Sequence, residues 1–152
     1  MRWLAFLLIA TLIAACGWLA TEPLPGLDPL SSSEVQAAQL VQDLGQWPAD
    51  ALEFQQLRIV GDTLEAVVSH SGGCAEHGYA LVFMNVFLES DPVQMRGLLS
   101  HDAKGDPCRA LLTRTLRFDL TPLKESYRAN YRVTSGTIIL GGNWPERLRY
   151  EF

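Results

Sequence analysis

The chain has 152 residues, with 12 basic and 17 acidic side chains and a net charge of −5 at pH 7. This length suits one folded domain, and an acidic balance without a basic patch excludes a nucleic-acid partner held through its phosphates. The sequence contains no phosphate-binding loop, dinucleotide fingerprint or Gly-x-Ser-x-Gly motif, so we expect a protein that is not an enzyme.

The first fifteen residues predict a secretory signal peptide. Met1-Arg2 gives a short basic start, and residues 3–13 form an apolar run that is too short to span a bilayer permanently. Ile13-Ala14-Ala15-Cys16 follows this run and resembles the lipobox of bacterial lipoproteins. The resemblance implies cleavage before Cys16 and attachment of diacylglycerol to its sulfur. An ordinary secretory peptide that is cleaved elsewhere is the alternative.

Lipidation of Cys16 would hold the protein at the membrane of the cell envelope. Each buried methylene contributes about 0.8 kcal/mol, so two or more acyl chains bind a bilayer stably. Gly17 and Trp18 follow the cysteine, without the Asp that retains such lipoproteins at the inner membrane. The predicted location is therefore the outer membrane, with the protein facing the periplasm.

A tether and one short helix are expected after the cysteine. Three prolines interrupt residues 16–32, which we interpret as a flexible tether. Ser33 is a candidate helix N-cap, and apolar residues recur at a spacing of three from Val35 to Leu44. This pattern predicts an amphipathic helix over residues 33–44, with a disordered continuation of the tether as the alternative.

Residues 33–152 are expected to form one mainly β domain. From residue 54 onward, apolar side chains alternate with polar ones or run continuously, and Thr121-Pro122 suits the start of a short helical crossing to about Asn130. We predict an antiparallel, immunoglobulin-like β-sandwich of about seven strands, with a partly open barrel as the alternative. The expected strands cover residues 54–60, 63–69, 79–88, 93–100, 110–120, 131–140 and 147–152.

Two loops carry the remaining cysteines. In an antiparallel meander every second connection lies at the same end of the sheet, which places loops 70–78 and 101–109 together. Cys74 and Cys108 lie in these loops and are the cysteines left once Cys16 is lipidated. In an oxidising envelope we expect them to form a disulfide, which contributes about 3 to 4 kcal/mol through the loop that it closes.

The same loops bring together the histidines of the chain. With the disulfide intact, imidazoles and one carboxylate form a candidate site for zinc or copper. An interpretation without any cofactor, in which these side chains hydrogen-bond within their loops, is preferred. The candidate ligands are His70, His77, His101 and Asp102.

Two further interpretations use the cysteines as thiolates. Cys74 and Cys108 with His77 and His101 match the ligand count of a tetrahedral zinc site, but their spacing and the oxidising compartment count against it. A nucleophile built from Cys74 and His77 would need a free thiol and an orienting third group. Both interpretations fail if the disulfide forms.

A resemblance to a set of uncharacterised bacterial lipoproteins is carried by three segments: Ser71-Gly72-Gly73-Cys74-x-x-His77-x-Tyr79-x-Leu81, His101-Asp102-x-x-x-Asp106-x-Cys108 and Phe118-Asp119-Leu120-x-Pro122-Leu123. It covers about residues 65–125 and implies no activity. We therefore expect a non-enzymatic, lipid-anchored envelope module that presents its disulfide-tied end, or a sheet face, to a protein or cell-wall partner. The alternative is a periplasmic module that binds zinc or copper.

Overall fold

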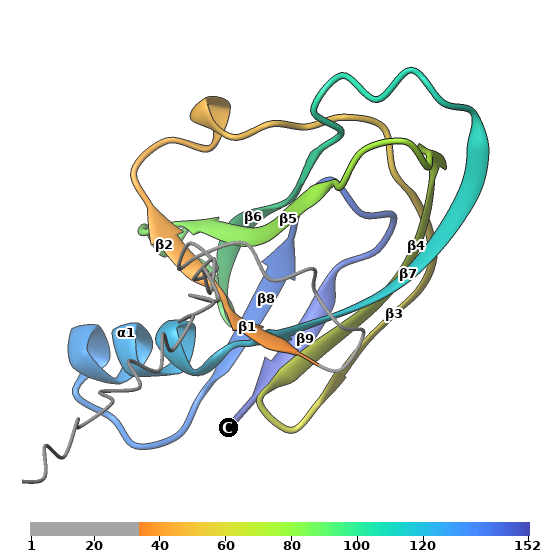
Figure 1. Cartoon of the computed structure of the whole chain (residues 1–152). Coiled ribbons are helices and arrows are strands. Elements are labelled where there is room, and N and C mark those ends of the chain that lie inside the picture. Colours follow the sequence, from red (N-terminus) through yellow and green to blue (C-terminus); the bar gives the residue numbers. More distant parts are fainter. Residues whose placement is uncertain (1–33) are drawn as a thin grey trace, which may run out of the picture.

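Residues 34–152 are described by a computed structural model and form a mainly β fold with two sheets (Figure 1). One α-helix, α1 (Thr121–Tyr131), and one turn of 3₁₀ helix, η1 (Leu44–Gln46), accompany the strands. The strands of this region are β1 (Val35–Ala37), β2 (Gln39–Val41), β3 (Glu53–Val60), β4 (Thr63–Gly72), β5 (Gly78–Met84), β6 (Val93–Asp102), β7 (Ala110–Asp119), β8 (Thr137–Gly141) and β9 (Leu148–Glu151).

The core lies between the two sheets. The first sheet has the strand order β1-β7-β4-β3, and the second has the order β2-β5-β6-β8-β9. Alternate residues of each long strand point inward, as in Leu64, Ala66 and Val68 of β4, which are at most 1% exposed. The largest of the fully buried side chains are Tyr150 and Phe83 from the second sheet and Phe118 from the first.

The prediction of a mainly β, sandwich-like fold is confirmed, but its details are wrong. The described residues form nine strands rather than seven, and three pairings are parallel: β1 with β7, β2 with β5, and β6 with β8. A parallel pair needs a long connection, and β7 with α1 supplies it between β6 and β8. The pairing pattern therefore departs from the predicted antiparallel, immunoglobulin-like arrangement.

The predicted helix over residues 33–44 is also wrong. Within the described residues this segment forms β1 and β2, which lie on the edges of different sheets. Val35 pairs with Arg117 and Gln39 pairs with Val82, while Ala38 between the strands is 3% exposed. The backbone groups of β7 and β5 would otherwise be unpaired at these edges, and satisfying them overrides the weak helical pattern.

The predicted helical crossing after β7 is confirmed by α1, which begins at Thr121 and ends at Tyr131. Asp119 accepts hydrogen bonds from the backbone N–H and the hydroxyl of Thr121. Arg132 adopts a left-handed conformation, with φ of 56°, and ends the helix. The strand predicted over residues 131–140 is consequently shortened to β8.

The predicted signal peptide of residues 1–15 and the predicted tether of residues 16–32, including Cys16, lie outside the described residues, as does Ser33. Within residues 34–152, no helix has the length and apolar character needed to span a membrane.

Candidate functional site

Two loops at one end of the sandwich are tied together by a disulfide. The loop between β4 and β5 and the loop between β6 and β7 each cross from one sheet to the other, because β4 and β7 share one sheet while β5 and β6 share the other. Cys74 in the first loop is bonded to Cys108 in the second, with Cα atoms 5.7 Å apart. The predicted disulfide is confirmed, although the loops are crossovers between sheets rather than turns of one meander.

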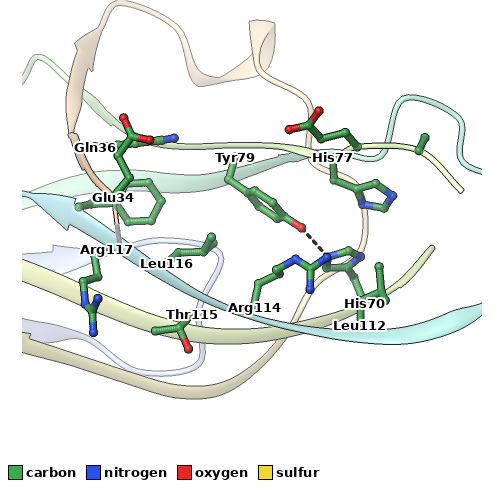
Figure 2. A pocket seen from close by; sticks show the side chains of 13 residues that line it. Glu34, Gln36, His70, His77, Tyr79, Leu112, Arg114, Thr115, Leu116 and Arg117 are labelled. Carbon is green, nitrogen blue, oxygen red and sulfur yellow. Dashed lines mark hydrogen bonds between the residues drawn. The ribbon is translucent and has the colours of Figure 1, made fainter. Parts of the chain in front are cut away.

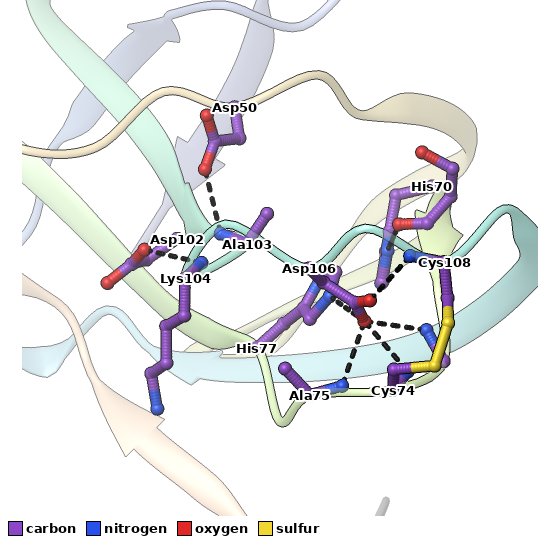
Figure 3. Close-up of polar contacts among 12 residues, drawn as sticks. Asp50, His70, Cys74, Ala75, His77, Asp102, Ala103, Lys104, Asp106 and Cys108 are labelled. Atoms are coloured by element: carbon purple, nitrogen blue, oxygen red, sulfur yellow. Dashed lines mark hydrogen bonds and ion pairs between the residues drawn. A yellow bond between two sulfur atoms is a disulfide. The ribbon is translucent and has the colours of Figure 1, made fainter.

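Asp106 holds the first crossover against the second (Figure 3). Its Oδ2 atom accepts hydrogen bonds from the backbone N–H groups of Gly73, Cys74 and Ala75 at 2.8, 2.9 and 2.9 Å. Its Oδ1 atom accepts one from Cys108 at 2.9 Å. The N–H groups of Cys108, Ala75 and Cys74 hold the pKa of this carboxyl far below its usual range, so Asp106 is a carboxylate.

Three imidazole rings occupy the interior beneath these loops. His70 lies in β4, His101 lies in β6, and His77 precedes β5, and none of them is more than 8% exposed. The ring centroids of His70 lie 4.5 Å from those of both His77 and His101, and the latter two are 4.9 Å apart. One ligand nitrogen of each ring lies within 4.8 Å of the others. The histidines predicted to meet therefore do meet, inside the fold.

The alternation of the strands explains why these polar rings are internal. His70 continues the buried run Leu64, Ala66 and Val68 at a spacing of two, and His101 continues the buried pair of Met95 and Leu99 on β6 in the same phase. Tyr79 pairs directly with His101 across β5 and β6, and their rings are 5.3 Å apart and nearly parallel, at 7°. Tyr79 was noted in the sequence only within the resemblance and not as a site residue, although its spacing of two from buried Leu81 and Phe83 could have revealed that it points inward.

The hydrogen bonds determine where the protons lie in two of the rings. His77 Nε2 lies 3.2 Å from Asp106 Oδ2, and because a carboxylate can only accept, His77 Nε2 carries the hydrogen. His70 Nδ1 lies 3.0 Å from the carbonyl oxygen of Ser71 and therefore donates to it. In the neutral rings this leaves lone pairs on His77 Nδ1 and His70 Nε2.

Each lone pair meets one donor. The His101 Nε2–H group donates to His77 Nδ1 at 2.7 Å, and the Tyr79 hydroxyl donates to His70 Nε2 at 2.5 Å. His101 Nδ1 is then a bare acceptor that is buried without a hydrogen-bond partner among the described residues. Burial, followed by the charge of His70, lowers the pKa of His101, while burial raises the pKa of Tyr79. The cluster therefore favours a neutral His101 ring and a protonated Tyr79 hydroxyl.

A pocket of about 140 Å³ adjoins the cluster. His70, His77 and Tyr79 line it together with Ala75 and Glu76 of the first crossover, and residues of β7 and of the segment around β1 complete the lining (Figure 2). Arg114 of β7 also lines the pocket, next to Tyr79 and His70 in this view. The pocket thus gives two of the three imidazoles a route to the surface.

The prediction that Asp102 joins the histidines is wrong. Asp102 lies at the end of β6, where its Oδ1 accepts a hydrogen bond from the backbone N–H of Lys104 at 2.9 Å, and it is not among the grouped ligand atoms. The strand alternation that turns His101 inward turns the next residue away. Asp106, which was not among the candidate ligands predicted from the sequence, is the carboxylate that reaches the cluster.

The fold and the site define a sandwich-like β domain with a disulfide-tied end and a buried histidine cluster. No protein family matches the chain, and no curated protein does either. Among solved structures, it is similar to a NigD-like immunity protein from Bacteroides caccae, with a TM-score of 0.53 and 18% identity over 70% of this chain and 51% of that one. This likeness shows the fold alone.

Two further structures resemble the chain more weakly. A putative toxin-related protein from Parabacteroides distasonis gives a TM-score of 0.47 and 14% identity over 78% of this chain and 60% of that one. A protein of unknown function from Bacteroides vulgatus gives a TM-score of 0.48 and 12% identity over 78% of this chain and 55% of that one. The chain thus spans between about half and three fifths of the length of these three proteins.

Proposed function

We propose that the chain is a non-enzymatic lipoprotein of the bacterial envelope, anchored through Cys16, whose β domain presents its disulfide-tied end to a protein or cell-wall partner at the outer membrane. The observation that carries this proposal is the bond between Cys74 and Cys108. Structural disulfides are typical of oxidising compartments, which agrees with the signal peptide and lipobox predicted from the sequence.

The disulfide-tied end also has the exposure that a binding surface requires. Residues 73–76 of the first crossover are exposed, and so are Pro107 and Arg109 of the second. Leu111, at the start of β7, is 78% exposed, the largest value among the exposed large apolar side chains of residues 34–152. The disulfide and the bonds of Asp106 keep these groups in one arrangement, which lowers the entropy cost of binding.

The anchoring is tested by the mass of the mature N-terminus. The full-length chain is produced in a bacterium with an outer membrane, and we expect cleavage before Cys16 and a cysteine that carries diacylglycerol. The Cys16→Ser variant should lose the lipid and leave the membrane fraction. A mature protein that begins at unmodified Gly17, or further along the chain, would contradict the proposal.

The binding end is tested by placing a photo-crosslinking side chain at Leu111 in living cells. Val60 is the matched control position, since it is 56% exposed but lies beside the turn between β3 and β4, at the other end of β4. We expect discrete adducts from position 111 and none from position 60. Equal labelling from both positions would show that this end has no special role in binding.

A further inference from the structure

We propose that His70, His77 and His101 together bind one divalent transition-metal ion of the zinc or copper class. Neutral imidazole is a preferred ligand for both ions. This site goes beyond the proposed anchoring and partner binding, and neither function requires the other. Figures 2 and 3 show two of these residues, His70 of β4 and His77 of the first crossover.

The spacing of the nitrogens is close to what a metal ion needs. Zinc binds imidazole nitrogen at about 2.0 to 2.1 Å, so two tetrahedral ligands are about 3.3 Å apart. His77 Nδ1 and His101 Nε2 are 2.7 Å apart, and the grouped nitrogens of the three rings all lie within 4.8 Å. Ring movements of about one ångström therefore convert the hydrogen-bonded cluster into a coordination site.

The surrounding hydrogen bonds already orient two ligands. The Asp106 carboxylate accepts from His77 Nε2, and the Ser71 carbonyl accepts from His70 Nδ1. Metal-bound histidines usually have such a carboxylate or carbonyl on the nitrogen away from the metal, where it fixes the tautomer and raises the basicity of the ligand. His77 Nδ1 and His70 Nε2 are consequently the nitrogens left to bind an ion, the first beside His101 Nε2 and the second beside the Tyr79 hydroxyl.

The third ligand explains the buried acceptor that has no partner. Without an ion, His101 Nε2–H donates to His77, and His101 Nδ1 is left bare in the interior. When an ion binds, the proton of His101 moves from Nε2 to Nδ1, and the freed Nε2 lone pair coordinates the ion. The ring stays neutral and the cluster releases no proton. The backbone of residues 48–50 runs beside His101, since the Asp50 N–H group donates to the His101 carbonyl oxygen at 3.0 Å and the His101 N–H group donates to the Pro48 carbonyl oxygen at 3.2 Å.

The fourth coordination position lies toward Tyr79 and the pocket. The Tyr79 hydroxyl contacts His70 Nε2 and must give up this bond when the ion takes the nitrogen. The pocket that His70, His77 and Tyr79 line supplies the entry route. The result is a site with three protein ligands and an accessible fourth position. Arg114 lines the pocket, and its positive charge would favour an anionic fourth ligand.

The competing interpretation is a purely structural cluster of hydrogen-bonded rings. Metal titration distinguishes the two interpretations. The full-length mature protein is oxidised, its free thiols are blocked and bound metal is removed with a chelator. It is then titrated with Zn²⁺ in one experiment and with Cu²⁺ in another. We expect one ion per chain and a higher melting temperature with the ion. Binding by the wild type that is no tighter than by the His77→Gln, His101→Gln double variant would overturn the proposal.

Single variants test the roles of the individual groups. We expect His101→Gln to weaken binding by about 100-fold or more, and Asp106→Asn by about 10- to 100-fold through the orientation of His77. Asp102→Asn is the matched control, since this carboxylate lies outside the cluster, and binding should change less than about twofold. Equal losses for Asp102→Asn and Asp106→Asn would contradict the assignment.

One measurement needs no variant and therefore does not depend on how the variants fold. Long-range ¹H–¹⁵N NMR spectra of the histidine rings report which nitrogen carries the proton. We expect Zn²⁺ to move the proton of His101 from Nε2 to Nδ1 while His70 and His77 keep their tautomers. Unchanged His101 resonances at saturating Zn²⁺ would reject the site, whereas the lipidation of Cys16, tested by mass, would be unaffected.

Discussion

Asp106 and His77 join the two crossovers at one point: the Asp106 Oδ2 atom that accepts three backbone N–H groups of the first crossover also lies 3.2 Å from Nε2 of His77. Both side chains are buried, at 0% and 3% exposure. One carboxylate thus sets the conformation of a surface loop and the tautomer of an interior ring. Substitutions of Asp106 should therefore change both the stability of the fold and the orientation of His77 in the histidine cluster.

We expect Asp106→Asn to lower the melting temperature by about 5 to 10 °C, because an amide replaces a carboxylate that accepts several charge-assisted hydrogen bonds. Asp102→Asn removes an acceptor for a single backbone N–H in the same loop and should change the melting temperature by less than about 2 °C. Calorimetry of both variants at pH 7 makes the comparison. Similar losses in the two variants would mean that Asp106 is an ordinary turn residue.

The protein should lose stability as the pH falls from neutral toward 5. Burial, followed by the charge of His70, lowers the pKa of His101 in the folded state. Below about pH 6.5 the unfolded chain binds a proton at His101 more readily than the folded protein does. The contribution of the neutral His101 ring to the free energy of unfolding is therefore full above that pH and declines below it. Unfolding at pH values between 5 and 7 should therefore take up protons, and His101→Gln should reduce the uptake.

A second loss is expected at lower pH. The backbone N–H groups of Cys108 and Ala75 lower the pKa of Asp106, so its contribution is present above about pH 4 and disappears as the pH falls toward the folded pKa. Denaturation curves between pH 2 and 5 measure this slope. The Asp106→Asn variant should show a shallower slope, and an identical one would assign the acid sensitivity to other carboxylates.

Removing the disulfide should reduce the free energy of unfolding by about 3 to 4 kcal/mol, because the bond joins residues that are 34 positions apart. The Cys74→Ser, Cys108→Ser double variant is compared with the wild type by urea unfolding. A thiol count on denatured protein made in the periplasm provides an independent check. Two free thiols per mature chain would show that the bond does not form in the cell.

Gly72→Ala should be more damaging than Gly105→Ala. Both glycines have positive φ, of 153° and 69°, but a Cβ at Gly72 would lie 2.7 Å from the His77 ring and 3.0 Å from Asp106 Oδ2, whereas nothing lies within 4 Å at Gly105. We expect about 1 kcal/mol of destabilisation at Gly105, from backbone strain, and more than about 3 kcal/mol at Gly72. Urea unfolding measures both, and equal effects would remove the steric argument.

The disulfide and the meeting of the histidines were predictable because they depend on coarse features. Two cysteines in loops of an exported β domain have few alternatives to pairing, and strand alternation already places His70 and His101 in phase with buried residues. The choice between Asp102 and Asp106 was not predictable in this way. Both are loop carboxylates in the sequence, and only the backbone path of the second crossover turns Asp106 toward Gly73, Cys74 and Ala75.

The prediction of a helix over residues 33–44 was wrong for a different reason. The spacing of Val35, Ala38 and Val41 fits one face of a helix, and nothing local opposes it. The competing interactions come from β7 and β5, whose pairing residues are about 40 to 80 positions away in the sequence. Strand formation at a sheet edge depends on such distant partners more than on local propensity, so a single-sequence pattern does not contain the information.

The position of β1 and β2 also determines how the domain carries mechanical load. A pull on the chain before residue 34 acts first on the three residue pairs between β1 and β7, and next on the three between β2 and β5. Detaching both strands would free residues 35–41, which span about 25 Å at about 3.3 to 3.6 Å per extended residue. The disulfide lies beyond these pairs along the chain, so the histidine cluster would stay assembled while this segment absorbs the extension.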